Sequence, residues 1–310
     1  MLHMQLGRAQ DLTISREDIT PELAQKLVRS QFPQWAELPV RPVRQSGWDN
    51  RTFRLGDDLL IRMPSGEGYA PQVPKEQEWL PKLAPQLPLE IPQPVAMGAP
   101  GEGYPWHWSI YRWIAGEPAT TGKVASMAQL ALDLAGFLRA LQAADTTGGP
   151  LAGPHSWYRG GHLEVYGHET RRAVAALGNL VEGQLVTEIW EAAVATRWPH
   201  EPVWVHGDVT AQNLIVRHGV LHAVIDFGCS AVGDPACDLA VAWTLFSGDS
   251  REAFVSAMGL DDGTWLRGMG WTLWKALITI EGSPSPRHPW ATESMRVIGE
   301  VVRDYLVWRS

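Results

Sequence analysis

Residues 203–216 read VWVHGDVTAQNLIV, and this segment carries more structural and chemical information than any other in the chain. A short apolar run, typical of a strand, leads into a polar loop, and the loop leads into a second apolar run. The loop presents Asp208 and, five residues later, Asn213. A carboxylate in such a loop can accept a hydroxyl proton, and an amide oxygen can bind a hard cation. The segment therefore predicts a strand–loop–strand unit that carries catalytic residues.

A second acidic residue follows the next predicted strand. Thirteen residues after Asn213 comes Asp226, within Ile225-Asp226-Phe227-Gly228. We expect strands at Leu214–Arg217 and Val220–Ile225, joined by a turn at His218-Gly219. This hairpin would bring Asp226 back beside Asn213. Together with waters and phosphate oxygens, the two side chains would form a typical Mg²⁺ environment.

These segments resemble the aminoglycoside phosphotransferase family, a branch of the protein-kinase-like fold. His-Gly-Asp-x₄-Asn at 206–213 stands in place of the protein-kinase His-Arg-Asp loop, and Ile-Asp-Phe-Gly at 225–228 in place of Asp-Phe-Gly. Residues 233–240, GDPACDLA, are similar to the family's G-D-P-x-x-D-L-A segment. The resemblance covers roughly residues 25–305 and is sharpest over 203–240. It implies a phosphotransferase in which Asp208 is the catalytic base and Asn213 and Asp226 bind the metal.

The rest of the chain fits an α+β, bilobal protein-kinase-like fold. Short extended runs at Arg41–Gln45, Arg51–Leu55, Leu59–Met63 and Trp106–Trp113 predict a small N-terminal antiparallel sheet, while the pattern is mainly helical from Val124 onward. We expect a nucleotide-binding lobe with an N-terminal helix over residues 1–112. A larger, mainly helical lobe over 113–310 would hold the catalytic and substrate-binding residues. A cleft between two such lobes is a natural place for a ligand.

The resemblance also implies residues that hold the nucleotide phosphates. Residues 45–50, QSGWDN, would form the loop over the phosphates, with Ser46 among the nucleotide-binding residues. Arg62 occupies the position where the family carries Lys, and an Arg can bind phosphates through several donors. Glu76 would pair with Arg62, with Glu78 as the competing partner. The alternative for Arg62 and Glu76 is an ordinary surface ion pair.

Residues 111–117, YRWIAGE, resemble the hinge between the lobes. The resemblance implies that the Arg112 carbonyl and the Ile114 N–H pair with the edge of the nucleotide base, with Tyr111 nearest to that base. The expected cofactors are ATP and Mg²⁺. The sequence does not decide between ATP and GTP.

The acceptor is expected to be a small molecule with a hydroxyl group. Family members act on aminoglycosides and on other alcohols such as choline, methylthioribose, homoserine and macrolides. The following residues are candidates for the walls of the acceptor pocket: Trp157, Tyr158, Arg159, Asp261, Asp262, Trp271, Trp274 and Glu281. Carboxylates there would suit an amine-bearing substrate. Alternatively, the two aspartates cap the helix that contains Trp265, and the two later tryptophans pack in the core.

Two polar residues near the catalytic loop are expected to have structural roles. His206 precedes Asp208 by two residues, and a histidine there more often fixes the backbone than transfers protons. Asp238 falls at a predicted helix start, where its carboxylate can cap free N–H groups or brace the catalytic loop.

Composition excludes several other classes of protein. The net charge of −8 argues against a general nucleic-acid binder. Two cysteines form no disulfide framework, and neither a signal peptide nor a membrane span is apparent, so we expect a cytoplasmic protein with no membrane partner. A nucleotide-binding pseudokinase and a protein kinase remain as alternatives, although no Ala-Pro-Glu segment follows Gly228. The sequence does not indicate an oligomeric state.

Overall fold

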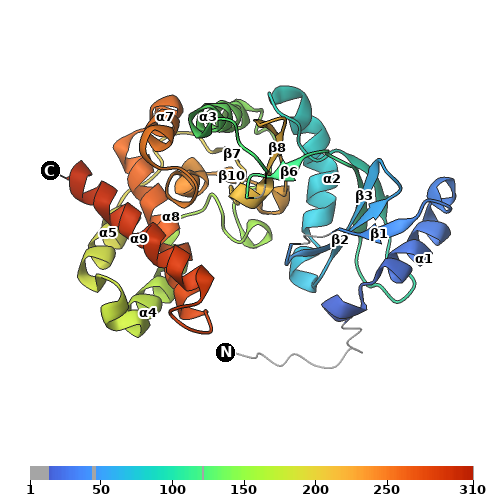
Figure 1. Ribbon diagram of the computed structural model, residues 1–310, viewed down its shortest axis with the longest axis horizontal. Coiled ribbons are helices and arrows are strands. Elements are labelled where there is room, and N and C mark those ends of the chain that lie inside the picture. Colours follow the sequence, from blue (N-terminus) through green and yellow to red (C-terminus); the bar gives the residue numbers. More distant parts are fainter. Residues whose placement is uncertain (1–13, 44–46, 121, 310) are drawn as a thin grey trace. The chain divides into compact units, whose positions relative to one another are not determined.

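A computed structural model of the chain describes residues 14–43, 47–120 and 122–309. The described residues form two compact units (Figure 1). The first contains the residues up to Pro81 together with Pro92–Trp113, and the second contains Lys82–Ile91 and the residues from Ile114 onward.

The first unit is built on a five-stranded antiparallel sheet in the order β1-β2-β3-β5-β4. Its strands are β1 (Val40–Pro42), β2 (Asn50–Leu55), β3 (Leu59–Pro64), β4 (Pro94–Gly98) and β5 (Trp108–Arg112). The predicted strands at 51–55, 59–63 and 106–113 are confirmed to within three residues at their ends. The predicted strand at 41–45 extends beyond the described residues.

Helices α1 (Pro21–Gln31) and α2 (Gln72–Leu83) lie on opposite sides of this sheet (Figure 1). The expected N-terminal helix is α1, and it begins at Pro21 because the Thr20 hydroxyl accepts the Leu23 N–H and proline occupies the first turn. Alternate residues of β2 and β3, such as Phe53 and Ile61, pack with Leu27 of α1 in a buried core. Three 3₁₀ turns accompany these elements, at Arg16–Asp18, Pro33–Trp35 and Glu67–Tyr69, and a fourth at Ala84–Gln86 follows α2 in the second unit.

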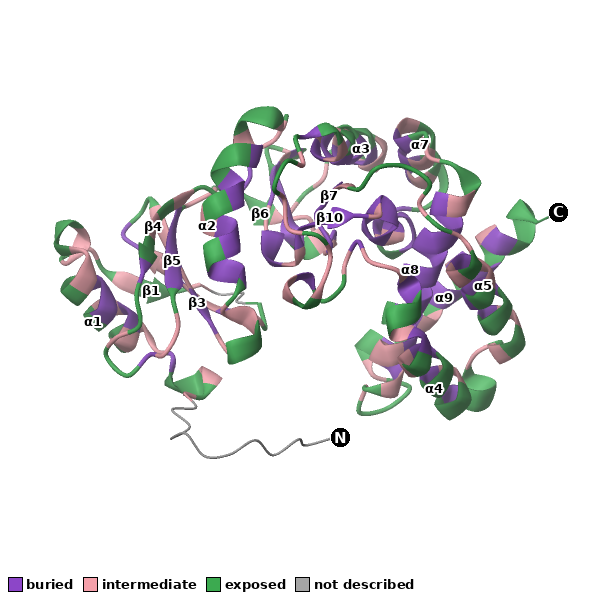
Figure 2. Cartoon of the chain, turned by 180° about the vertical axis from the view of Figure 1, so that it is seen from behind, coloured by how far each residue is buried: buried purple, intermediate pink, exposed green. Residues whose placement is uncertain are grey.

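The second unit is mainly helical. Its α-helices are α3 (Met127–Ala143), α4 (Gly167–Leu177), α5 (Gly183–Ala195), α6 (Val241–Thr244), α7 (Gly248–Met258), α8 (Asp262–Glu281) and α9 (Pro289–Trp308). The apolar face of α3, which includes Leu130, Phe137 and Leu141, is buried. Helix α8 is buried along most of its length (Figure 2), because other helices and the turn at 235–240 pack around it. No described helix is both long enough and apolar enough to cross a membrane.

Two small sheets sit among these helices. In the first, β6 (Glu117–Pro118), β8 (Leu214–Arg217) and β9 (Val220–Val224) pair in antiparallel fashion, and in the second β7 (Val203–Val205) pairs with β10 (Ala231–Gly233). The predicted hairpin of β8 and β9 is confirmed. Residues 82–91 belong to this unit because Glu90 exchanges backbone hydrogen bonds with His222 and Val224 of β9. The remaining 3₁₀ turns lie at Pro154–Ser156, Leu163–Tyr166, Gly178–Leu180, Ala211–Asn213, Phe227–Cys229 and Pro235–Ala240. The predicted α+β class, an antiparallel sheet followed by a mainly helical part, is confirmed.

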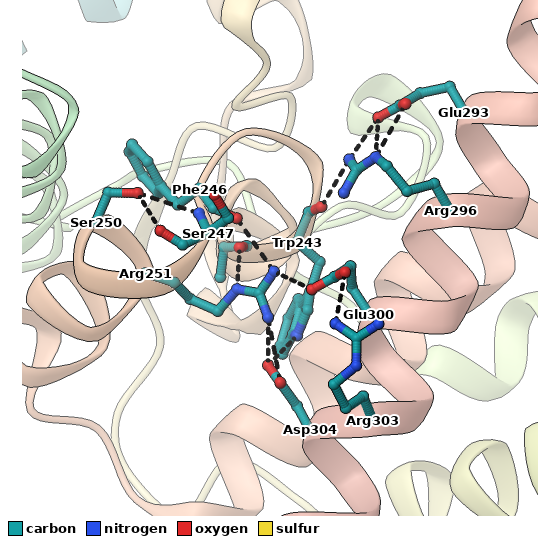
Figure 3. Close-up of polar contacts among 11 residues, drawn as sticks. Trp243, Phe246, Ser247, Ser250, Arg251, Glu293, Arg296, Glu300, Arg303 and Asp304 are labelled. Carbon is teal, nitrogen blue, oxygen red and sulfur yellow. Dashed lines mark hydrogen bonds and ion pairs between the residues drawn. The ribbon is translucent and has the colours of Figure 1, made fainter.

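A network of ion pairs joins helices α7 and α9 (Figure 3). Arg251 of α7 donates to Glu300 at 2.7 Å and to Asp304 at 3.0 Å, both on α9. Asp304 also accepts the indole N–H of Trp243 at 2.8 Å. The Arg251 side chain is only 12% exposed, so the two carboxylates share one poorly solvated cation. Breaking a shielded pair of this kind costs more than breaking a surface pair.

Replacing Arg251 by methionine should therefore lower the free energy of unfolding by about 2 kcal/mol at neutral pH. The pKa of Glu300 lies below its usual value, mainly because Arg251 and then Arg303 donate hydrogen bonds to it. A depressed carboxylate pKa stabilises the fold above the unfolded pKa, and this contribution is lost as the pH falls through the folded pKa. Denaturant unfolding between neutral and acidic pH should show the wild type and R251M converging in acid.

Arg171→Met is the matched control, because Arg171 also binds two carboxylates, those of Glu164 and Glu191, but is 45% exposed. Its loss should cost at most about 1 kcal/mol. Equal destabilisation by the two variants would show that burial of the Arg251 network adds nothing.

Candidate active site

Asp238 supports the loop at 206–213, which is called the catalytic loop because it carries the predicted base. The Asp238 carboxylate, in a residue only 1% exposed, accepts the backbone N–H of His206 at 2.8 Å and that of Gly207 at 2.7 Å. Burial raises the pKa of Asp238, and the nearby His206 and these two hydrogen bonds oppose that shift. The predicted bracing role is confirmed. Of the two alternatives given for Asp238, capping or bracing, the structure therefore shows bracing, and the side chain that caps the turn at 235–240 is that of Asp234.

His206 fixes the backbone on both sides of its ring. Its Nδ1 accepts the Asp208 N–H at 3.2 Å, so its Nε2 carries the proton and donates to the Ile225 carbonyl at 3.0 Å. The fully buried ring also meets the Phe227 ring edge to face, with centroids 4.7 Å apart. His206 therefore ties the catalytic loop to the segment that carries Asp226, as its predicted structural role requires.

Gly207 occupies a position that no other residue fits without strain. Its φ is +83°, a left-handed conformation that glycine adopts readily. A Cβ at this position would lie 2.5 Å from the Cys229 carbonyl oxygen and 2.9 Å from the Arg159 Cβ. The His-Gly-Asp sequence thus reflects a tight turn packed under neighbouring backbone.

Asp208 is held by Asn213. The Asn213 amide nitrogen donates to the Asp208 carboxylate at 3.1 Å and to the Asp208 carbonyl at 2.9 Å. Burial raises the pKa of Asp208, as does the negative charge of Asp226, whereas His206, Arg159 and Lys275 act in the opposite direction. A carboxylate fixed in this way is suited to orienting a hydroxyl and accepting its proton.

Asn213 and Asp226 are neighbours across the base of the β8–β9 hairpin. The Ile225 N–H donates to the Asn213 carbonyl at 2.9 Å, which places Asp226 one residue beyond this pair. Asp226 adopts a left-handed conformation with φ of +69°, a strained geometry that often marks functional positions. The hairpin therefore brings the two predicted metal ligands together as the sequence predicts.

The donor set fits Mg²⁺. An amide and a carboxylate supply the oxygen ligands that Mg²⁺ prefers. Within the described parts of the chain, no group of three or more His, Cys, Asp or Glu side chains could hold a metal ion. A site with two protein ligands is typical of Mg²⁺, because this ion usually keeps several waters and also binds phosphate oxygens.

A cavity of about 260 Å³ opens beside Asp208 within the second unit. The catalytic loop from Gly207 to Ala211 forms one wall, and helices α8 and α9 form much of the rest. Trp271 and Trp274 of α8 and Val297 of α9 give the cavity an apolar surface. Both tryptophans are buried, so they pack in the core as well as lining the cavity. Asp208 is thus placed on the wall of a partly open, mostly apolar cavity.

Arg159 links the cavity to the catalytic loop. Its Nε donates to the Gly207 carbonyl at 3.0 Å. Its guanidinium lies over the Trp274 ring, 4.6 Å from the centroid, and 5.3 Å from that of Trp271. Of the eight candidates for the walls of the acceptor pocket, Arg159, Trp271 and Trp274 line this cavity.

The other five candidates do not line this cavity. Asp261 caps α8 by accepting the Thr264 N–H at 3.0 Å, as the alternative interpretation predicts, and Asp262 is an exposed residue in the first turn of that helix. Glu281 pairs with Arg172 at 2.8 Å, and Trp157 and Tyr158 are 42% and 39% exposed. These residues are absent from the lining of the cavity beside Asp208, and their role in binding an acceptor stays a prediction.

Sequence reasoning missed the polar residues that do line the cavity, among them Lys275 and Thr279 of α8 and Ser294 of α9. A signal for two of them was present. Trp271, Lys275 and Thr279 follow one another at intervals of four, which places them along one face of a helix. That spacing does not reveal which part of the chain the face contacts.

In the first unit, Arg62 of β3 pairs with Glu76 of α2. Arg62 Nη1 lies 3.3 Å from both carboxylate oxygens of Glu76, and the Tyr111 hydroxyl donates to the same carboxylate. The two side chains are 13% and 4% exposed, so this is not an ordinary surface pair. The predicted pairing with Glu76, in preference to the exposed Glu78, is confirmed.

Two residues of the predicted hinge, Tyr111 and Arg112, differ in their burial. Tyr111 is 1% exposed, and its burial, followed by the charge of Glu76, raises its pKa well above the usual value. Its hydroxyl therefore supports the Arg62–Glu76 pair. Arg112 is exposed at the end of β5, and the boundary between the two units falls just before Ile114. Ser46, predicted to bind nucleotide, lies outside the described residues.

Comparisons with known proteins agree with this geometry. The model of the phosphotransferase enzyme family APH matches residues 40–272. Among solved structures, the GDP and kanamycin complex of the aminoglycoside phosphotransferase APH(2")-IIIa is similar with a TM-score of 0.68 and 20% identity, covering 91% of this chain and 98% of that one. The macrolide 2'-phosphotransferase MphH from Brachybacterium faecium is similar with a TM-score of 0.59 and 20% identity, covering 88% and 97%. No curated protein matches the chain.

The structural neighbours confirm the predicted bilobal, protein-kinase-like fold. The family match extends over more than half of the chain and includes both the Arg62–Glu76 pair and the catalytic loop. The chain therefore belongs to the phosphotransferase enzyme family whose members include the aminoglycoside phosphotransferases.

Proposed function

We propose that this protein transfers the γ-phosphoryl group of a nucleoside triphosphate, with Mg²⁺, to a hydroxyl group of a small molecule. The observation that carries the proposal is the position of Asp208. Its carboxylate is fixed by Asn213, its loop is braced by Asp238, and it lines a cavity of about 260 Å³. An acceptor hydroxyl in that cavity would meet a positioned base.

The chain's own residues divide the work of phosphoryl transfer. Asp208 orients the acceptor hydroxyl and takes its proton as the new bond forms. Asn213 and Asp226 would hold Mg²⁺, which when bound supplies neutralisation of phosphate charge. Arg62, kept in place by Glu76, would bind the phosphates of the nucleotide. Catalysis of this kind depends on positioning and electrostatics more than on covalent chemistry.

The ligands of the structural neighbours support both substrates of the proposed reaction. Neighbouring structures contain GDP, ADP or ATP, and some contain kanamycin, streptomycin or gentamicin. We therefore propose a purine nucleoside triphosphate as donor, with ATP and GTP to be compared directly. A non-transferring pseudokinase is disfavoured because Asp208, Asn213 and Asp226 are all present at fitting positions.

The proposal is tested by nucleoside diphosphate release with ATP or GTP, Mg²⁺ and a panel of acceptors. The panel should contain aminoglycosides, macrolides and small metabolic alcohols, and each product should be identified by mass spectrometry. We expect release that depends on the acceptor and a phosphorylated acceptor as product. Nucleotide binding without a phosphorylated product from any acceptor would favour the pseudokinase, and labelling of proteins in a cell extract would favour a protein kinase.

The metal assignment predicts that Asp226→Ala removes the effect of Mg²⁺ on nucleotide binding. One of the two proposed protein ligands is lost, so Mg²⁺ would no longer be anchored to the loop. Calorimetric titration of a nonhydrolysable nucleotide, with and without Mg²⁺, measures this directly. Asp249→Ala changes an exposed position of α7 and serves as the control. In this variant Mg²⁺ should strengthen nucleotide binding as it does in the wild type. Mg²⁺-dependent binding that survives in D226A would rule Asp226 out as a ligand.

A further inference from the structure

The charged side chains that line the cavity beside Asp208 differ in whether they have an ion-pair partner. Apart from Asp208 itself, the carboxylate on its lining is that of Glu293, and Arg296 of the same helix already binds it (Figure 3). The lining also contains two cations, Arg159 and Lys275. Lys275 is exposed at the rim, and no ion pair joins it to any residue in the described ranges. A ligand entering this space therefore meets more unpaired positive than negative charge outside the base.

Two residues of the lining carry buried N–H groups without acceptors. Neither Arg159 Nη1 nor Trp271 Nε1 has a hydrogen-bond partner among residues 14–43, 47–120 and 122–309. Trp271 is only 3% exposed. A buried donor without an acceptor costs free energy, and most such groups in native proteins are paired. Both atoms are themselves shielded from solvent, so a ligand in the cavity meets the charges of Arg159 and Lys275 rather than these two N–H groups.

The carboxylates expected to receive an amine are not at the cavity. Asp261 is used in capping α8, and Glu281 is paired with Arg172. A polyamine would bring its charge next to Arg159 and Lys275 without gaining an unpaired carboxylate other than the base. Placing like charges together in this way opposes binding.

The cavity is also small. Its volume of about 260 Å³ lies below the roughly 300–1,000 Å³ typical of sites that enclose drug-sized ligands. Its walls include Val209, Trp271, Trp274 and Val297. The cavity is partly open, so its volume does not set an upper limit on ligand size, but its walls favour a ligand with an apolar body.

We propose that the acceptor is a small, largely apolar alcohol that also carries a carboxylate, which Arg159 and Lys275 recognise while the hydroxyl lies at Asp208. This assignment rests on the proposed phosphotransferase function of the same site. It differs from a preference for amine-bearing acceptors. Lys275 is the residue that sets the charge preference, because Arg159 also supports the loop through Gly207.

Binding and transfer are measured separately in the test. The probes are phenyllactate, its carboxamide, and the amine in which an aminomethyl group replaces the carboxylate. Calorimetric titration without nucleotide should show that the carboxylate binds about tenfold more tightly than the carboxamide and that the amine binds most weakly. Tighter binding of the amine, or no saturable binding of the carboxylate, would overturn the proposal.

Variants of Lys275 test which residue is responsible. Lys275→Met should weaken binding of the carboxylate by about threefold to tenfold and leave the carboxamide unchanged, and Lys275→Glu should reverse the order of carboxylate and amine. Lys123→Met lies at an exposed position outside the lining and is the matched control. It should change neither the affinity for the carboxylate nor that for the carboxamide. A K275E variant that still prefers the carboxylate would refute the role of Lys275.

Nucleoside diphosphate release with the same probes keeps the two proposals apart. Preferential binding of the carboxylate without transfer would support the acceptor assignment and contradict the phosphotransferase function. Transfer to the amine in preference to the carboxylate would support the function and overturn the acceptor assignment.

Discussion

Replacing Asp208 by alanine should abolish phosphoryl transfer while nucleotide still binds. The carboxylate is the only acidic group of the second unit that both lines the cavity and receives the Asn213 amide among the described residues. Loss of a positioned general base reduces the rate by about 10²- to 10⁴-fold. Nucleotide affinity should change little, because the phosphates are assigned to Arg62 and the metal to Asn213 and Asp226. Steady-state turnover and calorimetric nucleotide binding measure the two effects separately.

Two further variants make this result specific to the carboxylate. Asp208→Asn keeps the size of the side chain and should be as inactive as the alanine variant, since an amide does not accept the proton. Asp262→Ala removes an exposed carboxylate that lies outside the cavity, and should retain wild-type turnover. Near-normal turnover by D208A on an established acceptor would show that the base is elsewhere.

Replacing Asp238 by alanine should cause the largest loss of stability among the site residues. Two backbone N–H groups, those of His206 and Gly207, would be left in the interior without an acceptor. Each unsatisfied buried donor costs about 1–3 kcal/mol, so a total of about 3 kcal/mol or more is expected. Turnover should fall as well, because the loop that carries Asp208 loses its support. Denaturant unfolding and turnover of the folded protein measure the two effects.

Asp238→Asn provides the matched comparison. The amide retains one oxygen acceptor, so this variant should be more stable than D238A and less stable than the wild type. Its turnover should also be intermediate. If D238A unfolded at the same denaturant concentration as the wild type, the carboxylate would not be what holds the loop.

The catalytic loop was predictable because its chemistry and its fold are both local. The strand, loop and hairpin of 203–225 follow from apolar runs and turn residues that lie close together in sequence. The hairpin alone brings Asp226 back to Asn213, so no long-range contact had to be known. The pairing of Arg62 with Glu76 is less local, and the family pattern supplied it.

The walls of the acceptor cavity were not predictable in this way. Helix α8 was expected to contribute, but its contact with the catalytic loop depends on long-range packing, including the pair of Arg267 with Asp234 at 2.6 Å. Residues 271, 275 and 279 face the cavity, whereas Glu281 lies about 200° further round the helix from residue 279. Sequence proximity to a cavity residue is therefore a poor guide to which carboxylates a ligand meets.

Strand pairings between distant segments were missed for the same reason. Strand β10 at 231–233 pairs with β7, and the two-residue strand β6 pairs with β8. Neither short segment shows an alternating pattern long enough to identify it as a strand. Both pairings lie beside the catalytic loop and help to fix its ends.

The most direct test of this account follows a labelled γ-phosphate in the presence of Mg²⁺ and an acceptor found in the panel. In the wild type the label should appear on a hydroxyl of that acceptor. In D208N, at saturating nucleotide and with unchanged nucleotide affinity, it should remain on the nucleotide. Label transferred to the acceptor by D208N at the wild-type rate would contradict the assignment of Asp208 as the base.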